Sequence, residues 1–338
     1  MRQMMQLGFL KIIFFMNIIC KKKIVLLCLC FLPLLSFSQT AVDTTLFRNP
    51  ENYNLALQHY LNQIAVDTIH QNNYYQAACY YTLLKNQELA FPYLKNAIVK
   101  GARGEDVITD TDFNLLKEDT TKWNEIEKLL KLQYAQRNPG ITKLDLGYEL
   151  WMIWIEDQRY RTFKKNNKLD DKSTTDIELH DIHLSKLNGL IESFGWPKYS
   201  EVGIEGGDAV FFIFQHDNAE NMKEILPLFI AAAKAGEADL KKAAMMIDRY
   251  LSYTENVQLY GTQAHRTIKP GQDRNDIPLQ LYPIADEENL INRRNAIGMG
   301  NFLENCNRLG VTYTPINERT DYFVIEIKKK WIKAGYLL

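Results

Sequence analysis

Residues 209–251 decide the fold, and they read AVFFIFQHDNAENMKEILPLFIAAAKAGEADLKKAAMMIDRYL. The first six residues are all apolar, a pattern typical of either a buried helix or a buried strand. The next two segments repeat apolar residues at helical spacing, with Asn218 as an N-cap and Gly236 as a stop. Because both neighbours are helical, we predict three consecutive helices. The first is buried, and Pro227 kinks or restarts the second.

A longer helix is predicted upstream, from about Thr142 to Phe163. At helical spacing its apolar side chains cover a wide arc, made of Leu146, Leu150, Trp151, Ile153, Trp154 and Ile155. Asp157, Gln158 and Arg161 fall inside that arc. A charged group aimed at a core is costly unless it is paired or hydrogen-bonded. We therefore predict a buried polar network here, with Asp157 and Arg161 as an i,i+4 pair.

A helix over 176–194 follows, and the turn Gly195-Trp196-Pro197 ends it. This helix carries His180 and His183 among acidic residues. The i,i+3 spacing of the two histidines can hold a metal ion, but no third ligand is defined. We predict a solvated acidic face instead.

The C-terminal third mixes short extended segments with helices. Residues 257–264 and 277–283 flank Lys269-Pro270-Gly271 and predict a small β-hairpin. Asp286 is expected to cap a helix that runs to about Asn305, with Arg294 on its apolar side. A final amphipathic helix is expected over 321–334.

The N-terminal region begins with a predicted helix over 51–65. Two helices follow, near 73–84 and 87–100, in which small residues at Ala78 and Ala90 allow a close approach. The spacing of their aromatic and small residues resembles a tetratricopeptide-type helical hairpin. Only one repeat is clear, so a structural cap is the simpler interpretation and a peptide-binding groove the functional one.

The fold class predicted from these segments is mainly α. A tetratricopeptide-like helical region is expected over residues 39–137, and a larger all-α domain with a small β-hairpin over 138–338. The boundary is placed at Asn138-Pro139-Gly140.

Residues 1–38 predict a signal peptide. Lys21-Lys22-Lys23 precedes a short apolar core that ends at small residues near Ser38. The start, at Met1 or Met16, stays open, and an uncleaved anchor is the alternative. We expect the protein to be exported, either to the periplasm or as a secreted protein.

The charge and the cysteine content limit the classes of ligand and partner that the protein is expected to bind. All 41 acidic side chains but only 35 of the 40 basic ones follow residue 38, because residues 1–38 hold five basic side chains and no acidic one. A mildly acidic protein without a basic stripe is a poor nucleic-acid binder, and none is expected. Cys79 and Cys306 remain after the signal segment, too few for a cysteine-based zinc site. We expect them to be buried free thiols rather than a disulfide, and no metal or cofactor is predicted.

Several short motifs together resemble one bacterial family, known as domain of unknown function 6624, over residues 145–306. They are Asp157-Gln158-x-x-Arg161, Gly195-Trp196-Pro197-x-x-Ser200-x-Val202-Gly203, Gln215-His216, Asp248-Arg249, Gln258-x-Tyr260-Gly261-Thr262-Gln263 and Arg294-x-x-x-Gly298. His265 and Arg266, which follow the fifth motif, are not part of the family pattern. The resemblance implies where a site lies and implies no chemistry.

Three functional hypotheses stay open. The first is a binding or interaction module with a polar pocket around His216 for a small molecule, peptide or glycan, and with a protein partner for the N-terminal helices. Its ligand-binding residues would be Asp157, Gln158, Arg161, Gln215, Arg249, Gln258, Tyr260, Gln263 and Arg294. The second is a hydrolase or lyase in which His216 is the general acid or base, oriented by Asp217 or Asp248. The third is a purely structural polar cluster.

Overall fold

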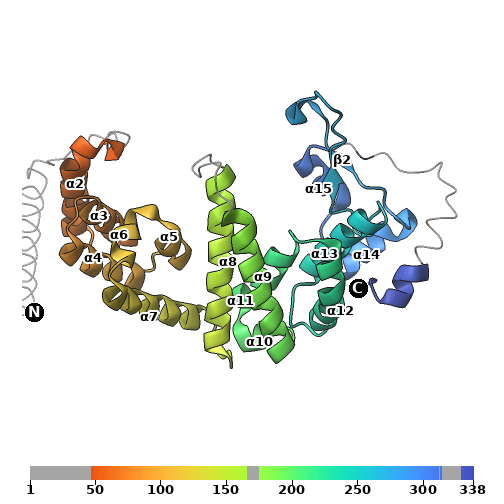
Figure 1. Ribbon diagram of the computed structural model, residues 1–338, viewed down its shortest axis with the longest axis horizontal. Coiled ribbons are helices and arrows are strands. Elements are labelled where there is room, and N and C mark those ends of the chain that lie inside the picture. The colour runs from red at the N-terminus through yellow and green to blue at the C-terminus, as the bar shows by residue number, and fades with distance from the viewer. Residues whose placement is uncertain (1–46, 166–174, 312, 314–328) are drawn as a thin grey trace, which may run out of the picture. The chain divides into compact units, whose positions relative to one another are not determined.

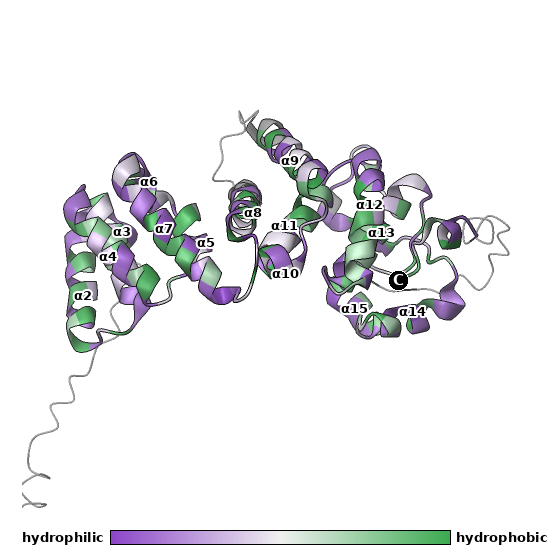
Figure 2. Ribbon diagram, turned by 90° about the horizontal axis from the view of Figure 1, so that it is seen from below, coloured by the Kyte–Doolittle hydropathy of each residue, from purple (hydrophilic) through white to green (hydrophobic). Residues whose placement is uncertain are grey.

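The computed structural model describes residues 47–165, 175–311, 313 and 329–338, without the side chains of 159–165, 175–178 and 274. Within this part the chain is mainly helical, which confirms the predicted mainly α fold (Figure 1). Most helices contain both hydrophilic and hydrophobic residues, as expected of helices that bury one side (Figure 2). None of the described helices is both long and apolar enough to span a bilayer.

Two units can be distinguished, residues 1–56 and residues 57–338, and each is considered by itself. In the first, the described residues form a short 3-10 helix, η2 (Pro50–Asn52), whose N-cap is the Asn49 side chain, and the start of α2 (Tyr53–Val66). The predicted signal segment, residues 1–38, lies outside the described residues.

The second unit begins with a group of helices that includes the predicted hairpin. They are α3 (Gln71–Leu83), α4 (Gln87–Val99), α5 (Gly104–Thr109), the 3-10 helix η3 (Thr111–Phe113), α6 (Asn114–Lys117) and α7 (Thr120–Arg137). α3 and α4 pack against one another, and both Ala78 and Ala90 are fully buried. The helical hairpin is thus confirmed, and its tetratricopeptide type stays a prediction.

Six further helices follow, α8 (Leu144–Lys165), α9 (Thr175–Phe194), α10 (Tyr199–Val202), α11 (Ile204–Phe214), α12 (Ala219–Lys234) and α13 (Leu240–Thr254). The apolar run 209–214 is the second half of α11, a buried helix as predicted. Asn218 caps α12 by accepting a hydrogen bond from the Asn221 amide at 2.9 Å. Helix α12 continues through Pro227 without a restart.

Helix α8 contributes to two hydrophobic cores. Leu150 and Ile153 belong to a core with α9, α11, α12 and α13. Trp151 and Ile155 belong to a second core with α3, α4 and α7. The wide apolar arc of this helix therefore has a simple physical reason, since it must bury two sides rather than one.

The C-terminal segment carries the predicted hairpin and two separate helices. Strands β1 (Ala264–His265) and β2 (Gln280–Leu281) pair antiparallel, with η4 (Arg274–Asp276) between them. Next come η5 (Glu287–Asn289), α14 (Leu290–Ala296) and α15 (Phe302–Leu309). Residues 329–334 are helical, and the rest of the predicted final helix lies outside the described residues.

The expected continuous helix from Asp286 to Asn305 is wrong. Gly298 adopts φ +65°, in the left-handed region that favours glycine, and ends α14. Asn301 then caps α15 by accepting hydrogen bonds from the amides of Leu303 and Glu304. Asp286 does not cap η5 with its side chain. Its carboxylate instead accepts a hydrogen bond from Arg293 at 2.7 Å.

Candidate functional site

Asp248, a predicted site residue, is fully buried on α13. One carboxylate oxygen accepts the backbone amides of Leu259 at 2.7 Å and Tyr260 at 2.9 Å. The other accepts the amide of Thr262 at 3.0 Å and its hydroxyl at 2.8 Å. Burial raises the pKa of Asp248 above its usual value, against the opposing effect of these four donors. The carboxylate therefore fixes the loop from 258 to 263.

Two neighbouring arginines hold the carbonyl side of the same loop. Arg294 donates to the carbonyl of Tyr260 at 2.6 Å and to that of Gly300 at 3.1 Å. Arg293 donates to the carbonyl of Leu259 at 2.9 Å and forms an ion pair with Asp286. Arg293 was not among the site residues predicted from the sequence. Both side chains are in fact buried, 9% and 4% exposed, and they donate to backbone carbonyls and, for Arg293, also to the Asp286 carboxylate.

Gln258 and Tyr260 complete the structural network. The Gln258 side chain accepts the Gln263 amide at 2.7 Å and donates to the carbonyls of Gln263 and Tyr282. The Tyr260 hydroxyl accepts the amide of Leu338 at 2.9 Å and donates to the carbonyl of Tyr336. The structural hypothesis thus accounts for Asp248, Gln258, Tyr260 and Arg294.

Arg249 and Gln263 connect this loop to the end of α11. The Arg249 guanidinium donates to the Gln263 side-chain oxygen at 3.1 Å and to the backbone carbonyl of Gln215. The Gln263 side-chain nitrogen donates to the Thr262 hydroxyl at 3.1 Å. These bonds bring together three predicted site residues, Arg249, Gln263 and Gln215. Gln215 takes part through its backbone carbonyl and not through its side chain.

His216 lies just beyond α11 and is exposed, so it does not occupy the centre of a buried cluster. The Asp217 carboxylate accepts the amide of Asn218 at 2.7 Å and the side chain of Asn221 at 2.6 Å. The histidine that faces Asp217 is His180 of α9, with 3.9 Å between its Nε2 and the carboxylate.

The polar end of α8 is partly buried. Asp157 is 5% exposed and accepts a hydrogen bond from the Gln158 side chain at 2.9 Å. The Arg161 side chain, its predicted partner, lies outside the described residues. The Glu156 carboxylate pairs with His183 of α9, with 3.1 Å between its Oε2 and the imidazole Nε2.

The expectation of a solvated face is wrong for His183, whereas His180 is half-buried. His183 is 3% exposed, because α9 packs against α8 and α11 on this side. Each histidine pairs with a carboxylate from another element through Nε2, and the Nδ1 atom of each is buried without a hydrogen-bond partner in the described structure. Among the described residues, no third potential metal ligand joins either histidine.

Three potential metal ligands approach one another elsewhere, at Cys79, Asp110 and Asp112, within 4.8 Å of each other. Here Asp110 already accepts hydrogen bonds from the Tyr75 hydroxyl, the Cys79 thiol and the Asp112 amide. Burial, and then the nearby Asp110 charge, hold the pKa of the Cys79 thiol well above its usual value. Cys79 and Cys306 are both buried free thiols, as predicted.

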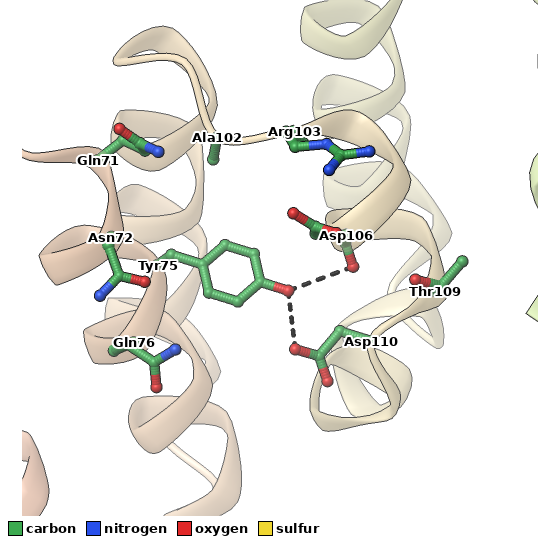
Figure 3. A pocket seen from close by; sticks show the side chains of 9 residues that line it. All are labelled: Gln71, Asn72, Tyr75, Gln76, Ala102, Arg103, Asp106, Thr109 and Asp110. Atoms are coloured by element: carbon green, nitrogen blue, oxygen red, sulfur yellow. Dashed lines mark hydrogen bonds between the residues drawn. The ribbon is translucent and has the colours of Figure 1, made fainter. Parts of the chain in front are cut away.

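A polar pocket of about 400 Å³ lies between α3 and α5 (Figure 3). It is lined by Gln71, Asn72, Tyr75, Gln76, Ala102, Arg103, Asp106, Thr109 and Asp110. The Tyr75 side chain points across it, and its hydroxyl lies 2.7 Å from the Asp110 carboxylate. A volume of this size falls within the range typical of ligand sites. A peptide-binding groove was one interpretation of this region from the sequence, but none of these residues was predicted to line it. The polar face of the helix near 73–84 was the feature of the sequence that indicated a binding surface.

Comparisons of the chain with protein-family models, curated proteins and solved structures return no match. The resemblance to domain of unknown function 6624 therefore stays a prediction.

Proposed function

We propose that this chain is a binding module, and that its ligand is a peptide segment held in the pocket between α3 and α5. One observation carries the proposal, namely the polar lining of that pocket. Gln71, Asn72 and Gln76 each offer both a donor and an acceptor from their side-chain amide. A peptide backbone offers the complementary pattern, one N–H and one C=O per residue.

The lining also favours binding over catalysis. Its nine residues include no histidine, and the neighbouring Cys79 thiol has a raised pKa that keeps it protonated. A protonated, buried thiol is a poor nucleophile. The hydrolase or lyase alternative around His216 stays a prediction that no described feature favours over binding.

The remainder of the chain would act as the scaffold, and we propose the family resemblance and the export of the protein on sequence grounds. Several motif residues hold backbone in place, among them Asp248, Tyr260 and Arg294. This supports a stable platform as their role. The apolar segment before Ser38 supports delivery outside the cytoplasm.

The test is a selection of random short peptides, displayed on phage, against the purified protein. Affinities of selected peptides are then measured by fluorescence anisotropy. We expect Gln76→Ala to weaken binding about fivefold, the effect of one lost hydrogen bond of ~1 kcal/mol. Gln58→Ala removes an exposed glutamine of α2 that does not line the pocket, and should leave affinity unchanged. Failure to select any peptide, or equal loss in both variants, would contradict the proposal.

A further inference from the structure

We infer that the pocket between α3 and α5 selects a peptide segment that carries a lysine or arginine side chain. This inference rests on the proposed function and deepens it. Its basis is the uneven charge of the pocket wall together with the position of one aromatic ring.

Two carboxylates stand on the α5 side of the pocket. Within the described part of the chain, no hydrogen bond or ion pair engages the exposed Asp106 carboxylate. Asp110 is half-buried; its Oδ2 accepts the Tyr75 hydroxyl and the Cys79 thiol, and its Oδ1 accepts the Asp112 amide. A carboxylate has about four acceptor sites, so both groups can still receive N–H donors from a ligand.

The two carboxylates outnumber the basic side chains in the lining of the pocket. Arg103 is the one basic residue among the nine that line the pocket, and its Nε lies 3.7 Å from Glu105. The Arg103 side chain is 69% exposed, so it is free to swing away from an incoming ligand. Lys117, which does not line the pocket, donates to the backbone carbonyls of Ile108 at 2.8 Å and Asp110 at 3.3 Å. The lining itself carries two carboxylates and one guanidinium, so an entering ammonium or guanidinium group meets a lining of net negative charge.

Tyr75 explains why a long basic side chain fits better than a small cation. Its ring packs edge-on against Phe113, with 5.3 Å between the centroids, and is held across the pocket. The stem of lysine or arginine can lie along this ring, and the charged head can interact with its face. Burial, followed by the charges of Cys79 and Asp110, raises the pKa of Tyr75, so the ring keeps its proton and adds no charge.

The test uses selected peptides in matched pairs that differ only in lysine versus norleucine, measured by anisotropy with the purified full chain. We expect norleucine to weaken binding about tenfold, the effect of one charge-assisted hydrogen bond. Added salt should shrink that difference, because it screens exposed charges. Asp106→Asn should reduce the preference for lysine. Glu118→Gln makes the same charge change at an exposed residue outside the pocket and should not.

The outcomes separate the two proposals. Peptides that bind equally well with lysine or norleucine would overturn the inference and leave the proposed function standing. If no peptide binds at all, both are overturned. Since the lysine-to-norleucine change is made in the ligand, this result does not depend on whether a variant protein folds.

Discussion

The contact between α8 and α10 lies where the two hydrophobic cores of the second unit meet, and a single substitution there tests it directly. Gly147 of α8 lies against the backbone at the end of α10. A Cβ atom at this position would stand 2.3 Å from the Val202 carbonyl oxygen and 3.0 Å from the Tyr134 hydroxyl. That hydroxyl donates to the same Val202 carbonyl and accepts the amide of Gly206 at 3.1 Å. Gly147→Ala must therefore displace backbone as well as a side chain.

The magnitude follows from two opposing effects. Alanine in a helix is favoured over glycine by about 1 kcal/mol. Overpacking of a rigid contact costs about 1–3 kcal/mol, and weakening the buried Tyr134 hydrogen bonds costs ~1–3 kcal/mol more. We expect Gly147→Ala to lower the free energy of unfolding by roughly 3 kcal/mol. With an m-value of ~3 kcal/mol/M, the urea midpoint should fall by about 1 M.

Gly189 of α9 provides a matched control, because a Cβ atom added to this helical glycine would meet nothing within 4 Å. Gly189→Ala should raise the free energy of unfolding by about 0.5–1 kcal/mol, since only the helix propensity changes. Both variants are measured by urea denaturation followed by circular dichroism. An unchanged or raised midpoint for Gly147→Ala would refute the close contact between α8 and α10.

Two further predictions concern the buried polar groups. Asp248→Ala leaves three backbone amides of the 258–263 loop without an acceptor, so the free energy of unfolding should fall by roughly 3–5 kcal/mol. Urea denaturation measures this change. A urea midpoint like that of the parent protein would contradict the structural role of Asp248. Because burial raises the pKa of both thiols, Cys79 and Cys306 should resist alkylation in the native protein at neutral pH and react fully in denaturant. Peptide mass spectrometry measures this, and rapid labelling of either cysteine in the native state would show that its thiol is accessible.

Most helices could be predicted from local patterns, because burial on one side leaves a clear period in the sequence. The helices over 219–254 follow from apolar spacing and caps, whereas the run 209–214 was predicted to be a helix only because its neighbours are helical. The break between α14 and α15 was missed although Gly298 and Asn301 are typical end and start signals. Apolar residues continue at helical spacing on both sides of the break, and that period masked it.

The candidate sites were harder, since they depend on which side of one element meets another. Helical spacing placed Asp157 in a buried arc correctly, yet it could not show that α9 covers His183. Arg293 and Arg294 are adjacent in sequence, and both become buried because the 258–263 loop presents carbonyls to each of them. The pocket residues come from α3, from α5 and from the residues that flank α5, and α5, with six residues, is too short to show a period.

The distribution of hydrogen bonds separates what stabilises this protein from what is available to a ligand. In the 258–263 loop, Asp248, Gln258 and Arg294 direct their polar atoms at backbone groups, where a ligand would have to break existing bonds. In the pocket between α3 and α5, the Asp106 carboxylate is exposed and carries no described hydrogen bond or ion pair. A ligand of the proposed kind would replace water at this carboxylate without breaking a described hydrogen bond of the protein, so occupying the pocket between α3 and α5 would cost less free energy than occupying the 258–263 loop.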